Sequence, residues 1–408
     1  MVRVVSIRDY LRPEPTEDDH AVYDIAYCEG CSDGAVIGRL EALEALARDA
    51  AGAQYAVAIL SGCRVVAYAE IAWDARFARC WRLDSRGRRW RRIEYRRLPD
   101  GRLHCMLTEE WDYLRAAQTE FDTTEGHRCW RFDPDGRADG AVDHRGGGGD
   151  GRHHDIDPAA MTLDWHFGDW AALCSFDNVI LSELPDPDPA IPTTPPWRPP
   201  RPLRPHLLTE LFTPGTRFEL DEGERVTTEL HGIGAVHLRN GRLAISDPTW
   251  LHDPAPWLTL APGRYSVELA VVRFDDPSIH PRVAAARLVV SRTAIASWEM
   301  ALREGEDPAF LDDESFFGFG VDSGVAGFLD PDAAPAIRTR LEDNYFQHDA
   351  DPTELPIPGL KSFRSGWGDG VYPVWLGRDA AGNLGAVVAD FLIAHHARIL
   401  TRTPIPAR

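Results

Sequence analysis

The sequence predicts an α+β fold in which two strand-rich domains, with mostly antiparallel sheets and a few helices, are joined by a proline-rich linker. Short apolar segments alternate with glycine-containing turns, helical periodicity is confined to two segments, and ten prolines fall between Pro185 and Pro205. Proline-rich segments adopt extended polyproline II and space domains. We therefore expect an N-terminal domain over 1–184, a linker over 185–206 and a C-terminal domain over 207–408.

The first helix is expected to begin near Ser32 and to end at Gly52. Leu40, Leu43 and Ala47 recur at helical spacing between these residues. Glycine is common just after the last residue of a helix because it adopts a left-handed conformation without strain.

After this helix the pattern changes to short strands separated by polar turns. Strands are expected at 56–60, 65–71 and 90–95. Turns of similar form, each with a glycine, follow at 84–88, 99–102 and 133–137. Glycine supplies the positive φ of tight hairpin turns, so three such turns predict an antiparallel meander.

Strand and turn signals resume after the linker, from about Ala235 onward. One later helix is expected with Asp330 or Asp332 as its cap. Its buried face is expected to carry Ile337, Leu341 and Tyr345. A last hairpin is expected at 371–376 and 386–391.

The charge balance limits the partners of the chain. Acids outnumber bases by 64 to 44, which gives a net charge of −20. Such a surface repels nucleic acid and anionic lipid at long range and favours basic or neutral partners. The N-terminus lacks the apolar stretch of a signal peptide, and no segment is apolar enough for a membrane helix. We expect a cytoplasmic protein whose seven cysteines are reduced thiols.

The C-terminal half carries five distinctive short segments, three of which contain glycine. They are Ser246-Asp247-Pro248, Pro262 to Tyr265, Trp298 to Ala301, Phe317 to Gly324, and Ser365-Gly-Trp-Gly-Asp-Gly370 followed by Tyr372-Pro373. With these residues, the region from about Leu230 to Phe391 resembles a bacterial protein family of unknown function with a Gly-Asp-Gly signature. The resemblance implies a compact domain and no particular activity.

Asp322 and Asp369 are the candidate catalytic residues, because each lies among glycines that would let a ligand approach the backbone. Together with Asp390 they could hold a divalent metal such as Mg²⁺ or Ca²⁺, or divide acid and base roles. Alternatively, these aspartates accept hydrogen bonds from the amides of their own turns. Trp367, Tyr372 and Arg364 are candidate binding residues, and the last two could also assist catalysis.

Three other groups of residues have a functional and a structural interpretation. The histidine group could bind zinc or iron, but a solvated loop is expected there; it comprises His144, His153, His154 and His166, with Asp155. Cys28 and Cys31 could form a redox pair at a helix start or half of a zinc site, but two ordinary thiols are favoured. Nine arginines lie between Arg79 and Arg97, interleaved with aromatic residues. They could grip nucleic acid, but a solvated face paired with acids is expected.

These features favour an acidic binding protein with an immunity-like or accessory role toward a basic protein partner. The sequence has no phosphate-binding loop of the Gly-x-x-x-x-Gly-Lys type and no Gly-x-Ser-x-Gly elbow. Apart from the divalent metal, no cofactor is evident. The alternative is a hydrolase or metal-dependent enzyme that uses Asp322 and Asp369 in a glycine-lined cleft. The sequence leaves the oligomeric state open.

Overall fold

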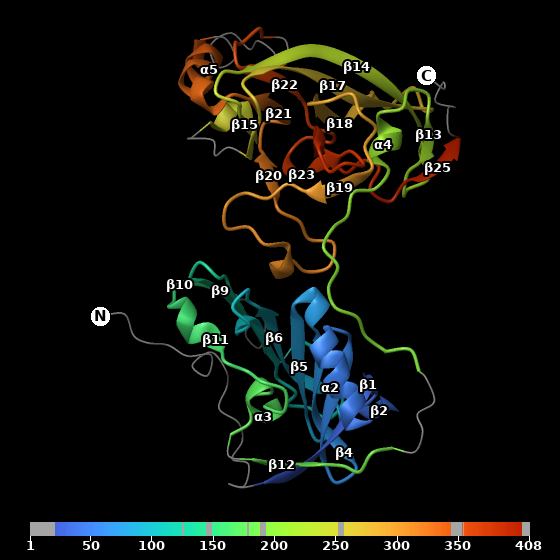
Figure 1. Ribbon diagram of the computed structural model, residues 1–408, viewed down its shortest axis with the longest axis vertical. Helices are drawn as coiled ribbons and strands as arrows, with labels where there is room; N and C mark the ends of the chain where they lie inside the picture. The colour runs from blue at the N-terminus through green and yellow to red at the C-terminus, as the bar shows by residue number, and fades with distance from the viewer. Residues whose placement is uncertain are drawn as a thin grey trace. The chain divides into compact units, whose positions relative to one another are not determined.

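The computed structural model describes residues 21–124, 126–143, 149–177, 179–187, 193–251, 257–343, 353 and 355–401. Strands predominate, nearly all strand pairs are antiparallel, and the helices are few and short, which confirms the predicted strand-rich character (Figure 1). No helix in these ranges has the length and apolar content of a membrane span.

Contacts between Cα atoms divide the chain into two compact units, Met1–Pro200 and Arg201–Arg408. Residues of the proline-rich segment pack within each unit. The indole of Trp197 donates to the carbonyl oxygen of Glu29 at 2.9 Å in the N-terminal unit. Leu203 is buried in the C-terminal unit. That two domains are joined by a linker over 185–206 stays a prediction.

The N-terminal unit is built on one twelve-stranded sheet, counted over the described residues. Its elements are β1 (Val22–Ser32), β2 (Ala35–Arg39), α2 (Ala42–Ala51), β3 (Tyr55–Ser61), β4 (Arg64–Ala72), η1 (Trp73–Ala75), β5 (Phe77–Leu83), β6 (Arg89–Arg97), β7 (Leu103–Trp111), β8 (His127–Phe132), β9 (Arg137–Asp143), β10 (Gly149–Asp155), η2 (Pro158–Met161), β11 (Thr162–Leu163), α3 (Trp170–Leu173) and β12 (Ile180–Glu183). Strands β3 to β10 are neighbours in chain order, which confirms the predicted meander. Gly87, Gly101 and Gly136 have φ values of 79°, 91° and 94° in its turns.

The expected first helix is correct only in its second half. Helix α2 ends at Ala51, and Gly52 follows it with a φ of 77°. Residues 35–39 instead form strand β2. Asp33 and Gly34 both have positive φ, at 50° and 72°, so the chain turns back sharply there. Two consecutive residues in this conformation make a hairpin turn and exclude a helix start.

The C-terminal unit contains a nine-stranded and a four-stranded sheet within the described residues. Its elements are α4 (Leu208–Leu211), β13 (Arg217–Glu219), β14 (Arg225–Leu238), β15 (Arg242–Ser246), η3 (Pro248–Trp250), β16 (Leu258–Thr259), β17 (Gly263–Phe274), β18 (Arg282–Val289), β19 (Ser297–Met300), η4 (Pro308–Phe310), β20 (Gly318–Val321), β21 (Val325–Leu329), η5 (Pro331–Ala333), α5 (Ala334–Leu341), β22 (Leu360–Arg364), β23 (Gly370–Arg378), β24 (Leu384–Asp390) and β25 (Arg398–Thr401). The long strands β14 and β17 pair along most of their length (Figure 1).

The later helix and the last hairpin of this unit are confirmed. The carboxylate of Asp330 accepts a hydrogen bond from the amide of Asp332 and caps η5, which leads into α5. Ile337 and Leu341 are buried on one face of α5, and Tyr345 lies outside the described residues. Strands β23 and β24 form the hairpin. It positions the Gly-Asp-Gly segment, which leads directly into β23.

Candidate functional site

The two glycine-rich turns that carry Asp322 and Asp369 lie side by side. Strands β20 and β23 pair antiparallel, and their last pair is Val321 with Gly370. Asp322 and Asp369 are the next residues on the two strands, so they face each other across the end of the ladder. Both aspartates are exposed. The structure therefore brings the two predicted catalytic residues together at one surface.

The turn before β23 folds tightly because of its glycines. Gly366 has a φ of 51°, and a Cβ atom on it would lie 2.7 Å from the Cβ of Phe391. No residue with a side chain fits there without a shift. The hydroxyl of Ser365 donates to the carbonyl oxygen of Gly368 at 2.9 Å. The same carbonyl oxygen accepts a hydrogen bond from the hydroxyl of Tyr372 at 2.8 Å.

Tyr372 therefore stabilises this turn through its hydroxyl group and is not an exposed binding residue. Its side chain is only 6% exposed. Burial, and to a lesser extent the charge of Asp369, raises the pKa of Tyr372 above its ordinary value. The phenol stays protonated at neutral pH and keeps donating to the turn. Arg364, the other predicted helper, is an exposed residue at the end of β22.

Asp247 organises the turn of Asp322, and sequence reasoning did not single it out as a functional residue. This carboxylate is 3% exposed. Its Oδ2 accepts hydrogen bonds from the amides of Asp322 at 3.0 Å and Ser323 at 2.8 Å. Its Oδ1 accepts from the amide of Thr249 at 2.8 Å. Asp247 thus holds the turn, while Asp322 is left to face solvent.

The carboxylates of Asp322 and Asp369 are available for an external ligand. Neither forms a hydrogen bond or an ion pair with another residue in the described part of the chain. The prediction that they bond the amides of their own turns finds no support in these contacts. Like charges directly opposite each other on paired strands are destabilising, and a bound cation would relieve this repulsion.

Two exposed apolar side chains lie two residues before and two residues after Asp369 in the chain. Trp367 is 58% exposed and Val371 is 57% exposed. One side of the Trp367 ring is covered by the guanidinium of Arg282, whose Cζ lies 5.0 Å from the ring centroid. We call Asp322, Trp367, Asp369 and Val371 the paired-turn surface. Exposed aromatic and aliphatic side chains beside charges are typical of an interaction site.

Asp390 does not belong to this surface. It lies on the face of β24 opposite to Phe391, because side chains alternate along a strand. Its carboxylate accepts hydrogen bonds from the indole of Trp375 at 3.1 Å and from the amide of Leu392 at 3.0 Å. Burial raises the pKa of Asp390 from 3.8 to about 6. For Asp390 the alternative interpretation fits, because its carboxylate accepts a hydrogen bond from an amide two residues further along its own turn.

The raised pKa of Asp390 predicts a pH-dependent stability. Between pH 4 and pH 6 the native carboxyl group keeps its proton while the unfolded one loses it, so the native state is progressively destabilised. Relative to Asp390→Asn, wild type should lose on the order of 2–3 kcal/mol over this range. Urea denaturation of both proteins at pH 4.5, 5.5 and 7 measures this difference. A constant difference across the three pH values would contradict the prediction.

The described members of the histidine group do not form a metal site. Among the described residues, no group of three histidine, cysteine, aspartate or glutamate side chains could hold a metal ion. His153 and His154 lie on β10, which pairs with β9 and is not the expected loop. His153 contacts Asp139 at 2.6 Å, and the ring of His154 stacks on Trp130. His144 lies outside the described residues.

Cys28 and Cys31 are free, buried thiols in β1. A hydrogen bond with Cys28, together with burial, raises the pKa of Cys31. Reactive thiols have lowered pKa values and lie in electropositive, exposed surroundings. Strand β2 follows them where a redox motif would need a helix. The two-thiol interpretation fits these contacts.

The arginine run over 79–97 pairs with acids of neighbouring strands, as expected. Arg91 lies 2.7 Å from Glu110, and Arg79 lies 2.6 Å from Glu70. The expectation of a solvated face is wrong for three arginines, which are buried: Arg82, Arg91 and Arg96. Their guanidinium groups lie over the aromatic rings of Phe176, Trp90 and Phe77, respectively, so each buried charge has a cation–π contact.

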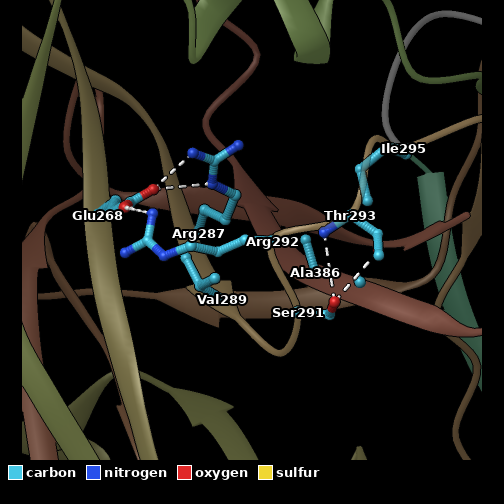
Figure 2. A pocket seen from close by; sticks show the side chains of 9 residues that line it. Glu268, Arg287, Val289, Ser291, Arg292, Thr293, Ile295 and Ala386 are labelled. Carbon is cyan, nitrogen blue, oxygen red and sulfur yellow. Dashed lines mark hydrogen bonds and ion pairs between the residues drawn. The ribbon is translucent and has the colours of Figure 1, made fainter. Parts of the chain in front are cut away.

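A small pocket of about 150 Å³ in the C-terminal unit is lined by residues of β17, β18 and β24 and of the segment that follows β18 (Figure 2). Figure 2 shows Glu268 between two arginines that point toward its carboxylate. Arg287 Nε donates to Glu268 at 3.1 Å, and Arg292 lies 3.7 Å from it. The positive charges of this pocket therefore already face an internal carboxylate.

The comparisons with known proteins concern the C-terminal unit. Residues 236–356 and 358–389 match the model of a family described as protein of unknown function (DUF4241). The match confirms the resemblance predicted from the five short segments, and it includes the whole paired-turn surface. No curated protein and no solved structure matches the chain.

Proposed function

We propose that the chain is a protein-binding module whose paired-turn surface takes up an arginine side chain from a basic segment of a partner. The observation that carries this proposal is the opposed pair Asp322 and Asp369, which is exposed and without a cation among the described residues. A guanidinium can donate to both carboxylates at once, which a lysine ammonium does less well. The role would be immunity-like or accessory to the partner.

Trp367 supports an arginine in particular. Arginine stacks on indole rings, and a buried or partly desolvated contact of this kind contributes about 0.5–2 kcal/mol. The ring already carries Arg282 on one side, and more than half of its surface faces solvent. A second guanidinium could stack on the exposed part of the ring. Val371 adds apolar area for the remainder of the partner segment.

The charge of the whole chain favours the same partner. A net charge of −20 attracts basic proteins at long range and raises their rate of encounter. The alternative of a hydrolase or metal-dependent enzyme uses the same two aspartates. It has less support, because the Tyr372 hydroxyl is engaged with the turn.

Two further inferences accompany this proposal, one about the domains and one about the cellular compartment. We infer that the units Met1–Pro200 and Arg201–Arg408 are domains connected through the proline-rich segment. We also infer a reducing compartment such as the cytoplasm, because the described cysteines are all free thiols and five are buried.

The proposal predicts that an eight-residue peptide of alternating arginine and glycine binds the full-length protein at low salt. Replacing both aspartates, Asp322→Asn with Asp369→Asn, should weaken binding by about tenfold, since two carboxylate contacts are lost. Trp367→Ala should weaken it further. Isothermal titration calorimetry at roughly 50 mM salt measures the affinity, and higher salt should lower it.

A matched control distinguishes peptide binding at this site from attraction by the net charge of the protein. Glu222 and Glu304 are exposed residues of the same unit, so Glu222→Gln with Glu304→Gln changes the net charge equally. If this control weakens peptide binding as much as the aspartate pair does, the peptide is held by overall charge and the proposal fails. Unchanged denaturation midpoints establish that all variants are folded.

A further inference from the structure

A second pocket in the C-terminal unit, far larger than that of Figure 2, collects histidines and arginines. It has a volume of about 570 Å³. We call it the histidine pocket. The charged and titratable side chains that line it are Arg201, Arg204, His206, Glu314, His395 and His396. Five of these six groups are cationic or can become so, and only Glu314 is an acid.

The arginines of this pocket have no internal partner. Neither Arg201 nor Arg204 forms an ion pair with a carboxylate in the part of the chain that the structure describes. Glu314 does not neutralise them, because its carboxylate contacts the ring of His395 at 3.3 Å. This differs from the pocket of Figure 2, where a carboxylate lies between the arginines.

The histidines are oriented by the surrounding backbone. His206 Nε2 lies 2.8 Å from the carbonyl oxygen of Ala397. A carbonyl oxygen only accepts, so this nitrogen carries the proton and the other nitrogen is left for a ligand. The rings of His395 and His396 contact each other, with centroids 4.1 Å apart. Two imidazoles this close cannot both be charged at low cost without an anion nearby.

The electrostatics of His395 agree with this geometry. Burial lowers its pKa, and the neighbouring His396 and His206 lower it further, whereas Glu314 raises it. The buried Asp390 interacts electrostatically with His206. A bound anion would offset the mutual repulsion of the histidines and favour their protonated forms.

The walls of the pocket are held in a fixed and strained arrangement. The amide of Arg201 donates to the Asp313 carboxylate at 2.7 Å, and the amide of Leu203 donates to the Ser315 carbonyl oxygen at 3.0 Å. Glu314, which lines the pocket, has a positive φ of 55°, and Leu207, the residue after His206, has a positive φ of 54°. This conformation is uncommon for residues with a side chain, and strained residues gather at functional sites.

We propose that the histidine pocket binds a doubly charged oxyanion of the phosphate type, held by Arg201 and Arg204 and by the protonated histidines. Guanidinium groups bind such oxyanions through paired hydrogen bonds. The volume leaves room for a small molecule that carries the phosphoryl group. Protons are taken up on binding, so affinity should rise as the pH falls.

The test uses the full chain and inorganic sulfate, which stays doubly charged between pH 6 and 8, with inorganic phosphate as second probe. Calorimetry at constant ionic strength should find one saturable site at pH 6, weaker by about tenfold at pH 8. Arg201→Gln with Arg204→Gln should weaken binding at pH 6 by at least about tenfold. The control Arg292→Gln removes a positive charge from the Figure 2 pocket and should leave binding unchanged.

Three results would overturn the proposal. They are the absence of a saturable site at pH 6, an affinity equal at both pH values, and an equal loss in the control and the arginine variants. A further measurement uses wild type alone, so it still tests the proposal if the arginine variant misfolds. In wild type, sulfate should shift the titration of the histidine ring signals in ¹H–¹⁵N spectra toward higher pH, and an unshifted titration would also count against the pocket.

Discussion

Replacing Asp247 by alanine should lower the free energy of unfolding of the C-terminal unit by about 3 kcal/mol or more. The carboxylate is buried and accepts hydrogen bonds from the amides of Thr249, Asp322 and Ser323. Each buried donor left without an acceptor costs about 1–3 kcal/mol. The measurement is chemical denaturation followed by tryptophan fluorescence.

The control for this change is Asp379→Ala. Asp379 also accepts hydrogen bonds from the amides of its turn, those of Ala381 and Asn383, but these hydrogen bonds are exposed to solvent. Water can replace its carboxylate, so a loss of about 1 kcal/mol or less is expected there. If both variants lose the same free energy, burial of Asp247 is not what stabilises the turn. Asp247→Ala should also abolish binding of the arginine peptide, because it releases Asp322.

Replacing Glu110 by alanine should destabilise the N-terminal unit by about 3–5 kcal/mol. Glu110 is 4% exposed and Arg91 is 1% exposed, and they face each other on β6 and β7. Removing the acid leaves a buried guanidinium without this partner. Arg128, whose Nη1 lies 3.9 Å from the same carboxylate, loses this contact as well.

The double variant Arg91→Met with Glu110→Leu tests this interpretation. It removes both charges and keeps their volume, so its stability should lie within about 1–2 kcal/mol of wild type. Arg102→Met breaks an exposed ion pair and should change stability by less than about 1 kcal/mol. A double variant as unstable as Glu110→Ala would show that packing, and not the loss of the Arg91–Glu110 ion pair, dominates.

The accuracy of the sequence predictions depended on how local each signal was. The glycines of the meander turns act through their own φ values, and Asp330 caps the residues beside it, so both were predictable. The helix expected from Ser32 failed in its first half because periodicity alone does not reveal a tight turn at Asp33 and Gly34. The arginine run was assigned to solvent because its aromatic and acidic neighbours lie on other strands.

In the candidate sites, the local glycine pattern was again predictable, and the contacts between strands were not. The glycine pattern around Asp322 and Asp369 marked both residues, and the resemblance to an uncharacterised family followed from the same segments. Only the pairing of β20 with β23 places the two acids opposite each other. Asp390, marked by the same reasoning, proved to be a buried partner of Trp375.

By itself, the sequence determined the strand-rich character, the hairpin turns, the acidic charge and the family resemblance of the C-terminal region. These properties depend on composition and on neighbours along the chain. Tertiary structure alone decided that Asp247 holds the turn of Asp322, and that His206 meets His395 and His396 in one pocket. The physical reason is that burial and electrostatic contact depend on distances in space, which residues far apart in sequence acquire only when the strands pair and the core packs.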